Sequence, residues 1–270
     1  MIPKLHKGLF SFFTGGLLLL VVFSGGCGDE SPQSGSAKVK LIIATDTTLV
    51  PMSFIGDEGT LIGFEPDLIA RLSEIAGFDY EMISVAWPGL FGGLITNKFD
   101  MVISSVTILE ERKERMAFSN PYLKSGLALV VRKDSQGVKN LADVKAKNLL
   151  AGAQVGTTAY FHLETIPAIR KKGYEAYGHA ITDLINGELD VVLGESTGTL
   201  YYKNQREDYF KQIKMVGEII TEEYYGIVFR KDDKELREKI NRGIDQLLQN
   251  GSVAKLHAKW NLGKAAQLPK

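Results

Sequence analysis

The residues around Arg112 have the chemistry of an anion site. Arg112 follows Thr107 by five residues, and both come after the apolar segment FDMVISSV, residues 99–106. An arginine side chain is a planar fork of N–H donors that can hold a carboxylate through two hydrogen bonds, and a threonine hydroxyl adds another donor. If the apolar segment is a strand, these donors lie at its end and could hold a carboxylate.

The same segment also fits a purely structural role. Residues 107–110, TILE, match the S/T-x-x-E pattern of a capping box, in which Thr107 would cap a helix and Glu110 would bond back to it. Arg112 and Arg115 would then be solvated on a short helix. The sequence alone leaves both interpretations open.

A carboxylate ends a second apolar segment. Glu195 is the last residue of LDVVLGE, residues 189–195. Because a carboxylate accepts hydrogen bonds from an ammonium group, Glu195 and Arg112 together would suit a zwitterion. The alternative is that Glu195 is an exposed carboxylate at a strand end.

A hydrolase pattern overlaps Glu195. GESTG, residues 194–198, matches G-x-S-x-G around Ser196, and Asp245 and His257 follow in the chain order of α/β-hydrolases. His257 lies in SVAKLHAKW, which has the pattern of a helix, and the sequence has no HGGG-type segment for an oxyanion hole. A serine hydrolase is therefore the weaker interpretation.

Composition argues against several other functions. Without Lys4 and Lys7, 30 basic residues face 32 acidic ones with no basic block, so nucleic acid is not an expected partner. His162 and His179 stand alone, and no histidine pair has metal-ligand spacing. We expect neither a metal nor a cofactor.

Strands alternate with helical patterns along most of the chain. The helical pattern after Pro66 ends at Gly77, and a long helical region covers residues 234–260. The predicted strands are VKLIIATD (39–46), FDYEMISV (78–85), FDMVISSV (99–106), LALVVRK (127–133), LLAGAQV (149–155), LDVVLGE (189–195) and YGIVFRK (225–231). This order is typical of α/β proteins.

One stretch of sequence recurs at an offset of 90 residues. LITNKFDMVISS, residues 94–105, aligns with LINGELDVVLGE, residues 184–195, and Asp100 matches Asp190. Each copy has the pattern of a helix end, a turn and a strand. The repetition predicts two α/β lobes of similar construction with a cleft between them.

Ligands of open parallel sheets bind beyond the carboxyl ends of the strands. The polar residues at these ends are Ser104, Ser105 and Thr107 in the first copy and Glu195 in the second. These residues are therefore candidates for the cleft.

The N-terminal segment has the pattern of an export signal. Residues 1–27 combine Lys4 and Lys7, an apolar stretch and small residues before Cys27, the only cysteine. We predict a signal peptide that ends at a lipid-modified Cys27, with secretion without a lipid as the alternative. Residues 28–37, GDESPQSGSA, have the composition of a flexible tether.

Taken in order, the motifs of residues 38–262 resemble one family, the amino-acid solute-binding proteins of ABC importers, also called solute-binding protein family 3. The resemblance is carried by IIATDTTLVPMSF, GFEPDLIARL, VAWPGLFGGLITNKFDMVISS, TILEERKERMAFSNPY, AQVGTTAY, LINGELDVVLGES and EEYYGIVFRKDDKELREKIN. It implies an α/β, two-lobed periplasmic binding protein type II fold, in which each lobe is a mainly parallel sheet flanked by helices.

The resemblance also implies the domain boundaries. Lobe 1 would be discontinuous, with residues 38–124 and 223–270, and lobe 2 would be residues 126–220. The chain would cross between the lobes near residues 124–126 and again near 221–224, which makes two hinge crossings.

The resemblance implies roles for the site residues. Arg112, Thr107, Thr157 and Thr158 would hold the α-carboxylate of an amino acid, and Ser105 and Glu195 its α-amino group. Side-chain selectivity would come from Asp46, Leu49, Trp87 and Gln154. Leu49 stands where many family members have an aromatic residue. The alternative to a binding role for Trp87 is a structural position in the core.

Asp46 with no lysine at Gln154 favours a polar or cationic ligand side chain over an acidic one, unless Asp46 only caps the following turn. The family's partner is the permease of an ABC transporter, and we expect a monomer that meets the membrane only through lipidated Cys27. A dehydratase on the same scaffold, with Glu195 as proton donor, is the other enzymatic alternative.

Overall fold

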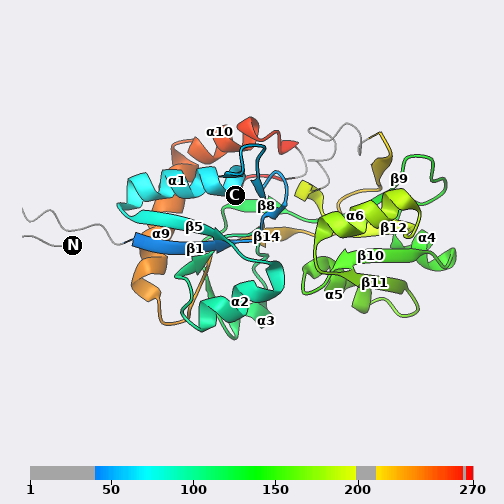
Figure 1. Cartoon of the computed structure of the whole chain (residues 1–270), viewed down its shortest axis with the longest axis horizontal. Helices are drawn as coiled ribbons and strands as arrows, with labels where there is room; N and C mark the ends of the chain where they lie inside the picture. Colours follow the sequence, from blue (N-terminus) through cyan, green and yellow to red (C-terminus); the bar gives the residue numbers. More distant parts are fainter. Residues whose placement is uncertain (1–39, 199–210, 264–265, 270) are drawn as a thin grey trace, which may run out of the picture. The chain divides into compact units, whose positions relative to one another are not determined.

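The computed structural model describes residues 40–198, 211–263 and 266–269 of the 270-residue chain. The predicted signal peptide, Cys27 and the predicted tether lie outside the described residues. Figure 1 shows two mixed sheets with helices on both faces of each. No helix within the described ranges is long and apolar enough to cross a membrane.

The first sheet has five strands in the order β5-β1-β6-β15-β7. The strands β1 and β5 are parallel, β1 and β6 are parallel, and β15 is antiparallel to both β6 and β7. Their bounds are β1 Lys40–Thr45, β5 Asp79–Ser84, β6 Met101–Val102, β7 Ala117–Phe118 and β15 Val228–Phe229.

Helices cover both faces of this sheet. One face packs against α1 (Phe64–Ala76), α9 (Lys234–Gln249) and α10 (Ser252–Lys259), and the other against α2 (Trp87–Ile95). The helix α1 buries its apolar stripe and ends at Gly77, which has φ 65° as its left-handed cap, as the sequence predicts. The predicted terminal helix is interrupted at Gly251 (φ 74°) and forms two helices.

The second sheet repeats the first in order and direction. Its order is β11-β10-β12-β9-β13, with β10 parallel to β11 and β12, and β9 antiparallel to β12 and β13. The strands are β9 Leu127–Arg132, β10 Leu150–Gln154, β11 Arg170–Tyr174, β12 Val191–Glu195 and β13 Ile213–Val216, and the helices are α4 Leu141–Ala146, α5 Thr158–Glu164 and α6 Tyr177–Asn186.

The sequence repeat corresponds to the same contacts in both sheets. Asp100 Oδ2 accepts a 2.8 Å hydrogen bond from Ile42 N, and Asp190 Oδ2 accepts one of 2.8 Å from Leu150 N. Two arginines make equivalent contacts in the two copies of the repeat. Arg230 donates to the carbonyls of residues 94 and 99, and Arg132 donates to those of residues 184 and 189. The repeat is therefore structural, as predicted.

Short strands connect and flank the two sheets. β8 (Leu123–Ser125) pairs with β14 (Glu223–Tyr225) in an antiparallel two-stranded sheet, at the places where the chain leaves the first sheet and returns to it. A small sheet of β2 (Thr48–Leu49), β3 (Ser53–Ile55) and β4 (Leu61–Ile62) follows β1. A four-residue helix, α3 (Glu110–Lys113), carries Arg112.

Several elements differ from the sequence-based prediction in extent. The predicted strand at residues 99–106 contains only the two-residue strand β6, because the chain turns at Ser105, which has φ 49°. The predicted strand at residues 225–231 is reduced to β15. The edge strand β11, RKKGY, was missed because four of its five residues are exposed and it lacks the apolar pattern of a buried strand.

Candidate functional site

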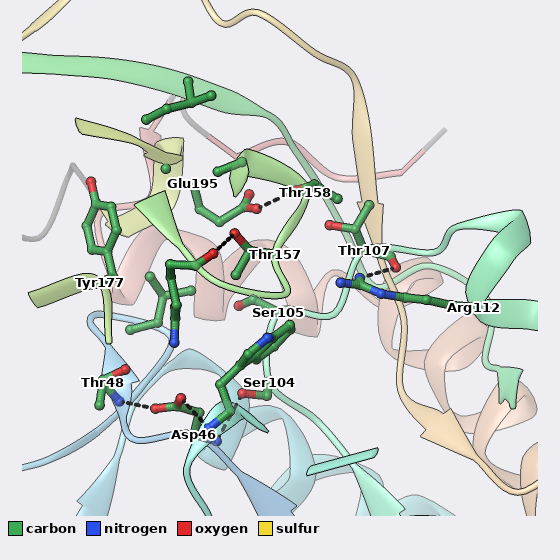
Figure 2. Close-up of a pocket in the computed structure, with 16 residues that line it drawn as sticks. Asp46, Thr48, Ser104, Ser105, Thr107, Arg112, Thr157, Thr158, Tyr177 and Glu195 are labelled. Carbon is green, nitrogen blue, oxygen red and sulfur yellow. Dashed lines mark hydrogen bonds between the residues drawn. The ribbon is translucent and has the colours of Figure 1, made fainter. Parts of the chain in front are cut away.

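One cavity brings the predicted site residues together, as Figure 2 shows for those it labels. It lies where the carboxyl ends of β1, β6, β10 and β12 and the first residues of α2 and α5 meet. All nine predicted ligand-binding residues line it: Asp46, Trp87, Ser105, Thr107, Arg112, Gln154, Thr157, Thr158 and Glu195. Leu49 lines it too.

Arg112 contacts carbonyls that come after a strand of the first sheet and after a strand of the second. Its Nη1 donates to the carbonyl of Thr107 at 2.9 Å, and its Nη2 donates to the carbonyl of Gly156 at 3.1 Å. The guanidinium carbon also lies 5.7 Å from the ring centre of Trp87 and 5.5 Å from that of Phe91. Burial lowers the pKa of Arg112, while Glu195 and Glu223 oppose this effect. A guanidinium has five N–H donors, so these two bonds leave donors for a carboxylate.

The capping-box interpretation of residues 107–110 is wrong. The helix α3 begins at Glu110, its N-cap is Leu109, and no side chain caps it. The hydroxyl of Thr107 instead donates to Glu223 Oε2 at 2.6 Å. Arg112 is also only part-exposed, because it reaches away from this short helix to the Gly156 carbonyl.

Glu195 accepts hydrogen bonds from two hydroxyls. Thr158 Oγ1 lies 3.2 Å from Glu195 Oε1, and Tyr225 Oη donates to Oε2 at 2.5 Å. Removal from water, followed by the nearby charge of Glu223, raises the pKa of Glu195 to about 8, although the hydroxyls and Arg112 act in the other direction. Glu195 is therefore no exposed strand-end carboxylate, and an ammonium group would favour its charged form.

The three predicted residues at the end of β10 and the start of α5 have different contacts. Thr157 is the N-cap of α5, and its hydroxyl also donates to the carbonyl of Gln154 at 2.7 Å. The side-chain amide of Gln154 donates to the carbonyl of Glu175 at 2.8 Å, which leaves its oxygen and its second N–H for other contacts. Thr158 contacts both Glu195 and Glu223.

Asp46 has structural partners at both carboxylate oxygens. Oδ1 accepts from Thr48 N at 2.8 Å, and Oδ2 accepts from Trp87 N, the first residue of α2, at 2.9 Å. The turn-capping alternative considered for Asp46 is thus present in the structure. Because a carboxylate has about four lone-pair sites, these two bonds do not prevent a further contact with a ligand.

Trp87 and Leu49 line the cavity and also pack in or against the hydrophobic cores. Trp87 is 7% exposed, packs edge-on against Phe91 at 5.4 Å, and belongs to the core that α2 forms on the first sheet. Leu49 packs against the core of the first sheet and also against the α6 core of the second. Tyr177, the first residue of α6, is an aromatic lining residue that was not predicted.

Ser105 is held by a buried carboxylate. Its backbone N and its Oγ lie 2.5 and 3.0 Å from Glu65 Oε1, which also accepts from Tyr122 Oη at 2.6 Å. Glu65 is fully buried, and loss of water contact raises its pKa. Glu65 was not predicted as a site residue because it lies in the first turn of α1, forty residues from Ser105.

The candidate hydrolase residues contact three different partners. Ser196 Oγ lies 3.1 Å from Ser125 Oγ, His257 Nε2 lies 2.8 Å from the carbonyl of Ala266, and Asp245 Oδ1 accepts from Asn120 Nδ2 at 2.9 Å. His257 lies within α10, as its pattern predicted. The structure therefore gives no support to a Ser-His-Asp triad.

Known proteins resemble this chain over most of its length. The profile of the bacterial extracellular solute-binding proteins, family 3, matches residues 41–264. The L-cystine-binding protein TcyJ of Escherichia coli (strain K12) is 28% identical over 222 residues, which cover 82% of each chain.

Solved structures are similar as well. An ancestral arginine-binding protein, solved bound to glutamine and bound to arginine, is 32% identical, with a TM-score of 0.77 over 83% of this chain and 98% of that one. The ancestral amino acid-binding protein AncCDT-1, a precursor of cyclohexadienyl dehydratase, is 30% identical, with a TM-score of 0.75 over 82% of this chain and 95% of that one.

Proposed function

The chain belongs to the bacterial extracellular solute-binding proteins, family 3, and from this membership and the site we propose that it captures a free amino acid and delivers it to the permease of an ABC importer. The observation that carries the proposal is one cavity lined by a guanidinium and a carboxylate: Arg112 comes after β6 of the first sheet, and Glu195 ends β12 of the second. An α-amino acid has the two complementary charges.

The fold prediction is confirmed, because two sheets of the same topology and the similar solved structures identify the two-lobed type II periplasmic binding protein fold. We propose that residues 38–124 and 223–270 form one lobe and residues 126–220 the other. The pairing of β8 with β14 between the two sheets supports hinge crossings at these places. Ligand-induced closure would then depend on contacts with both lobes.

In the proposed complex, Arg112 holds the α-carboxylate with help from Thr107 and Thr158, and Thr157 supports the turn before α5. Glu195 and Ser105 hold the α-ammonium group. Support comes from the position of all six side chains at one cavity and from the guanidinium donors that Arg112 keeps for a ligand.

For the ligand side chain we propose a cationic or amide group. If Arg112 and Glu195 pair with the α-carboxylate and the α-ammonium group, Asp46 adds a negative charge to the lining, and an acidic ligand would have to be desolvated beside it. Trp87 and Gln154 would complete this part of the site. The ancestral arginine-binding protein solved with arginine and with glutamine is consistent with this preference.

We further propose an extracytoplasmic monomer, anchored through a lipid on Cys27. The signal-like residues 1–27 and the extracellular family to which the chain belongs support the location and the anchor. Metabolic labelling with a fatty acid would test the anchor, with Cys27→Ser as the control that must lose the label.

A thermal-shift screen tests the binding function. The chain from Gly28 onward is heated with each common L-amino acid and its D-form. At a ligand concentration about a thousandfold above Kd, linkage adds roughly 4 kcal/mol, or roughly 8 to 16 °C for a protein of this size. A shift with one amino acid or a related group supports the proposal, and no shift with any of them contradicts it.

A dehydratase is the second candidate function. A carboxyl group with a pKa of about 8 is largely protonated at neutral pH and could act as a proton donor, and one similar protein is named as a precursor of a dehydratase. Incubation with carboxylated cyclohexadienyl substrates tests this alternative. Turnover that Glu195→Gln abolishes would favour the enzyme, whereas binding without turnover favours the transporter component.

A further inference from the structure

We propose that Glu223 is an internal competitor for the ligand, a carboxylate of the protein that takes the hydroxyl donors of the α-carboxylate site and thereby weakens affinity. This inference rests on the proposed function and goes beyond it. Glu223 lies in β14, the connecting strand, and is 6% exposed. It was not among the predicted site residues.

Three threonine hydroxyls contact the Glu223 carboxylate. Oε2 lies 2.6 Å from Thr107 Oγ1 and 2.9 Å from Thr158 Oγ1, and Oε1 lies 2.8 Å from Thr221 Oγ1. Thr107 follows β6 of the first sheet, whereas Thr158 begins α5 beside the second. One side chain thus bridges the two threonines that are proposed to help Arg112.

Each hydroxyl has one proton to donate, and a carboxylate in its charged form can only accept. In the structure the Thr107 hydroxyl donates to Glu223 Oε2. The Thr158 hydroxyl lies 2.9 Å from Glu223 Oε2 and 3.2 Å from Glu195 Oε1, and the shorter distance is the one to Glu223. A ligand carboxylate would therefore meet oxygen lone pairs unless both hydroxyls turn away from Glu223.

Charge acts in the same direction. Glu223 is one of the groups that favour the charged form of Arg112, so it already balances part of the guanidinium charge. An incoming carboxylate must replace Glu223 as the partner of the threonines and is repelled by it. Glu223 would keep the hydroxyl of Thr221, which also accepts from Leu127 N at 2.9 Å. Because the hydrogen bond from Thr221 remains, Glu223 can stay in position when Thr107 and Thr158 turn to a ligand carboxylate.

The experiment compares two neighbouring glutamates. Glu223→Gln keeps the shape and removes the charge. Glu222→Gln is the matched control, because Glu222 lies in the same segment but contacts Lys124 and Tyr224 on the surface and its side chain is 60% exposed. The probes are the amino acid with the largest thermal shift, L-arginine being tested first, and its α-carboxamide. Isothermal titration gives Kd for the wild type and both variants.

We expect Glu223→Gln to bind the amino acid about five- to tenfold more tightly, since hydrogen bonds to a charged acceptor are roughly twice as strong as neutral ones. Glu222→Gln should bind like the wild type. The gain should be absent for the carboxamide, which has no α-carboxylate. Improved binding of the carboxamide by the same factor would overturn the competition, because it would indicate a general change of the fold or charge.

Unchanged or weaker binding of the amino acid by Glu223→Gln also overturns the inference and makes Glu223 a supporting residue of the connecting strands. A wild type that binds no amino acid at all is a different result, because it refutes the proposed function itself. The two failures are therefore distinguished by the wild-type titration alone.

Discussion

Tyr225 and Glu195 are joined by a 2.5 Å hydrogen bond from the tyrosine hydroxyl to Oε2, which connects the strand β14 to the end of β12. Burial and the negative charge of Glu195 raise the pKa of Tyr225 well above 10, so the tyrosine remains a donor at all physiological pH values. The pKa of Glu195 itself rises to about 8, mainly because it is removed from water and lies near Glu223. Glu195 is the titrating partner of this pair.

We predict that amino-acid affinity increases with pH up to about 8. An α-ammonium group pairs with the charged form of Glu195, which must first lose its proton below pH 8. Between pH 6 and pH 7 the Kd should fall by nearly tenfold, and binding should release a proton. Titration calorimetry in buffers of different ionisation enthalpy measures both quantities. A Kd independent of pH would contradict the role of Glu195, and Glu195→Gln should bind weakly with no such dependence.

Without ligand, the same group should make stability fall as pH rises. The folded-state pKa of about 8 lies above the ordinary value of 4.5, so the folded protein binds the proton more tightly than the unfolded chain. The resulting stabilisation is complete below about pH 4.5 and lost as pH rises through about 8. The slope is at most about 1.4 kcal/mol per pH unit. Urea unfolding at pH 6, 7 and 8 measures it, and Glu195→Gln should lower the slope; an equal slope in both proteins refutes the assignment.

Arg112→Ala should abolish amino-acid binding and leave the fold intact. The variant loses the donors proposed for the α-carboxylate, which we expect to weaken binding about a hundredfold or more. Arg112→Lys keeps the charge without the planar fork, so its affinity for the amino acid should lie between those of the wild type and Arg112→Ala. Calorimetry gives Kd, and circular dichroism checks the fold. Undiminished affinity in the folded alanine variant would remove Arg112 from the site.

Local sequence patterns were sufficient to predict the two sheets and two of the residues that line the cavity. Asp100 and Asp190 occupy matching positions of the repeat, and each accepts a hydrogen bond from a backbone N–H of a neighbouring strand, so the two-sheet construction could be predicted from 24 residues. Arg112 and Glu195 were predicted from their positions after apolar segments. Both line the cavity because the strands of each sheet present their carboxyl ends to it.

Long-range contacts explain what was missed. The hydroxyl of Thr107 meets Glu223, which is 116 residues away, and this partner displaced the local capping box that the TILE pattern suggested. Nothing near Glu223 in sequence marks it as a site residue, although it lies in the predicted second crossing. The types and spacings of nearby residues do not indicate which distant carboxylate accepts the hydrogen bond of a given hydroxyl.

Glu65 provides the last prediction, because it holds a site residue without reaching the cavity itself. Ser105 has φ 49°, an unfavourable conformation for a residue with a side chain, and Glu65 Oε1 accepts from both its N and its Oγ. Glu65→Ala would leave these donors, Tyr122 Oη and Ser53 Oγ without their acceptor in a buried place.

We expect Glu65→Ala to lower the free energy of unfolding by about 3 kcal/mol or more and Glu65→Gln to cost less, since the amide oxygen still accepts. The exposed Glu58→Ala is the matched control and should change stability by less than about 0.5 kcal/mol. Urea unfolding measures all three. If Ser105 holds the ammonium group only when Glu65 orients it, Glu65→Gln should also weaken binding of an amino acid more than binding of its des-amino analogue. Equal stability of Glu65→Ala and the wild type would show that Ser105 keeps its conformation without Glu65.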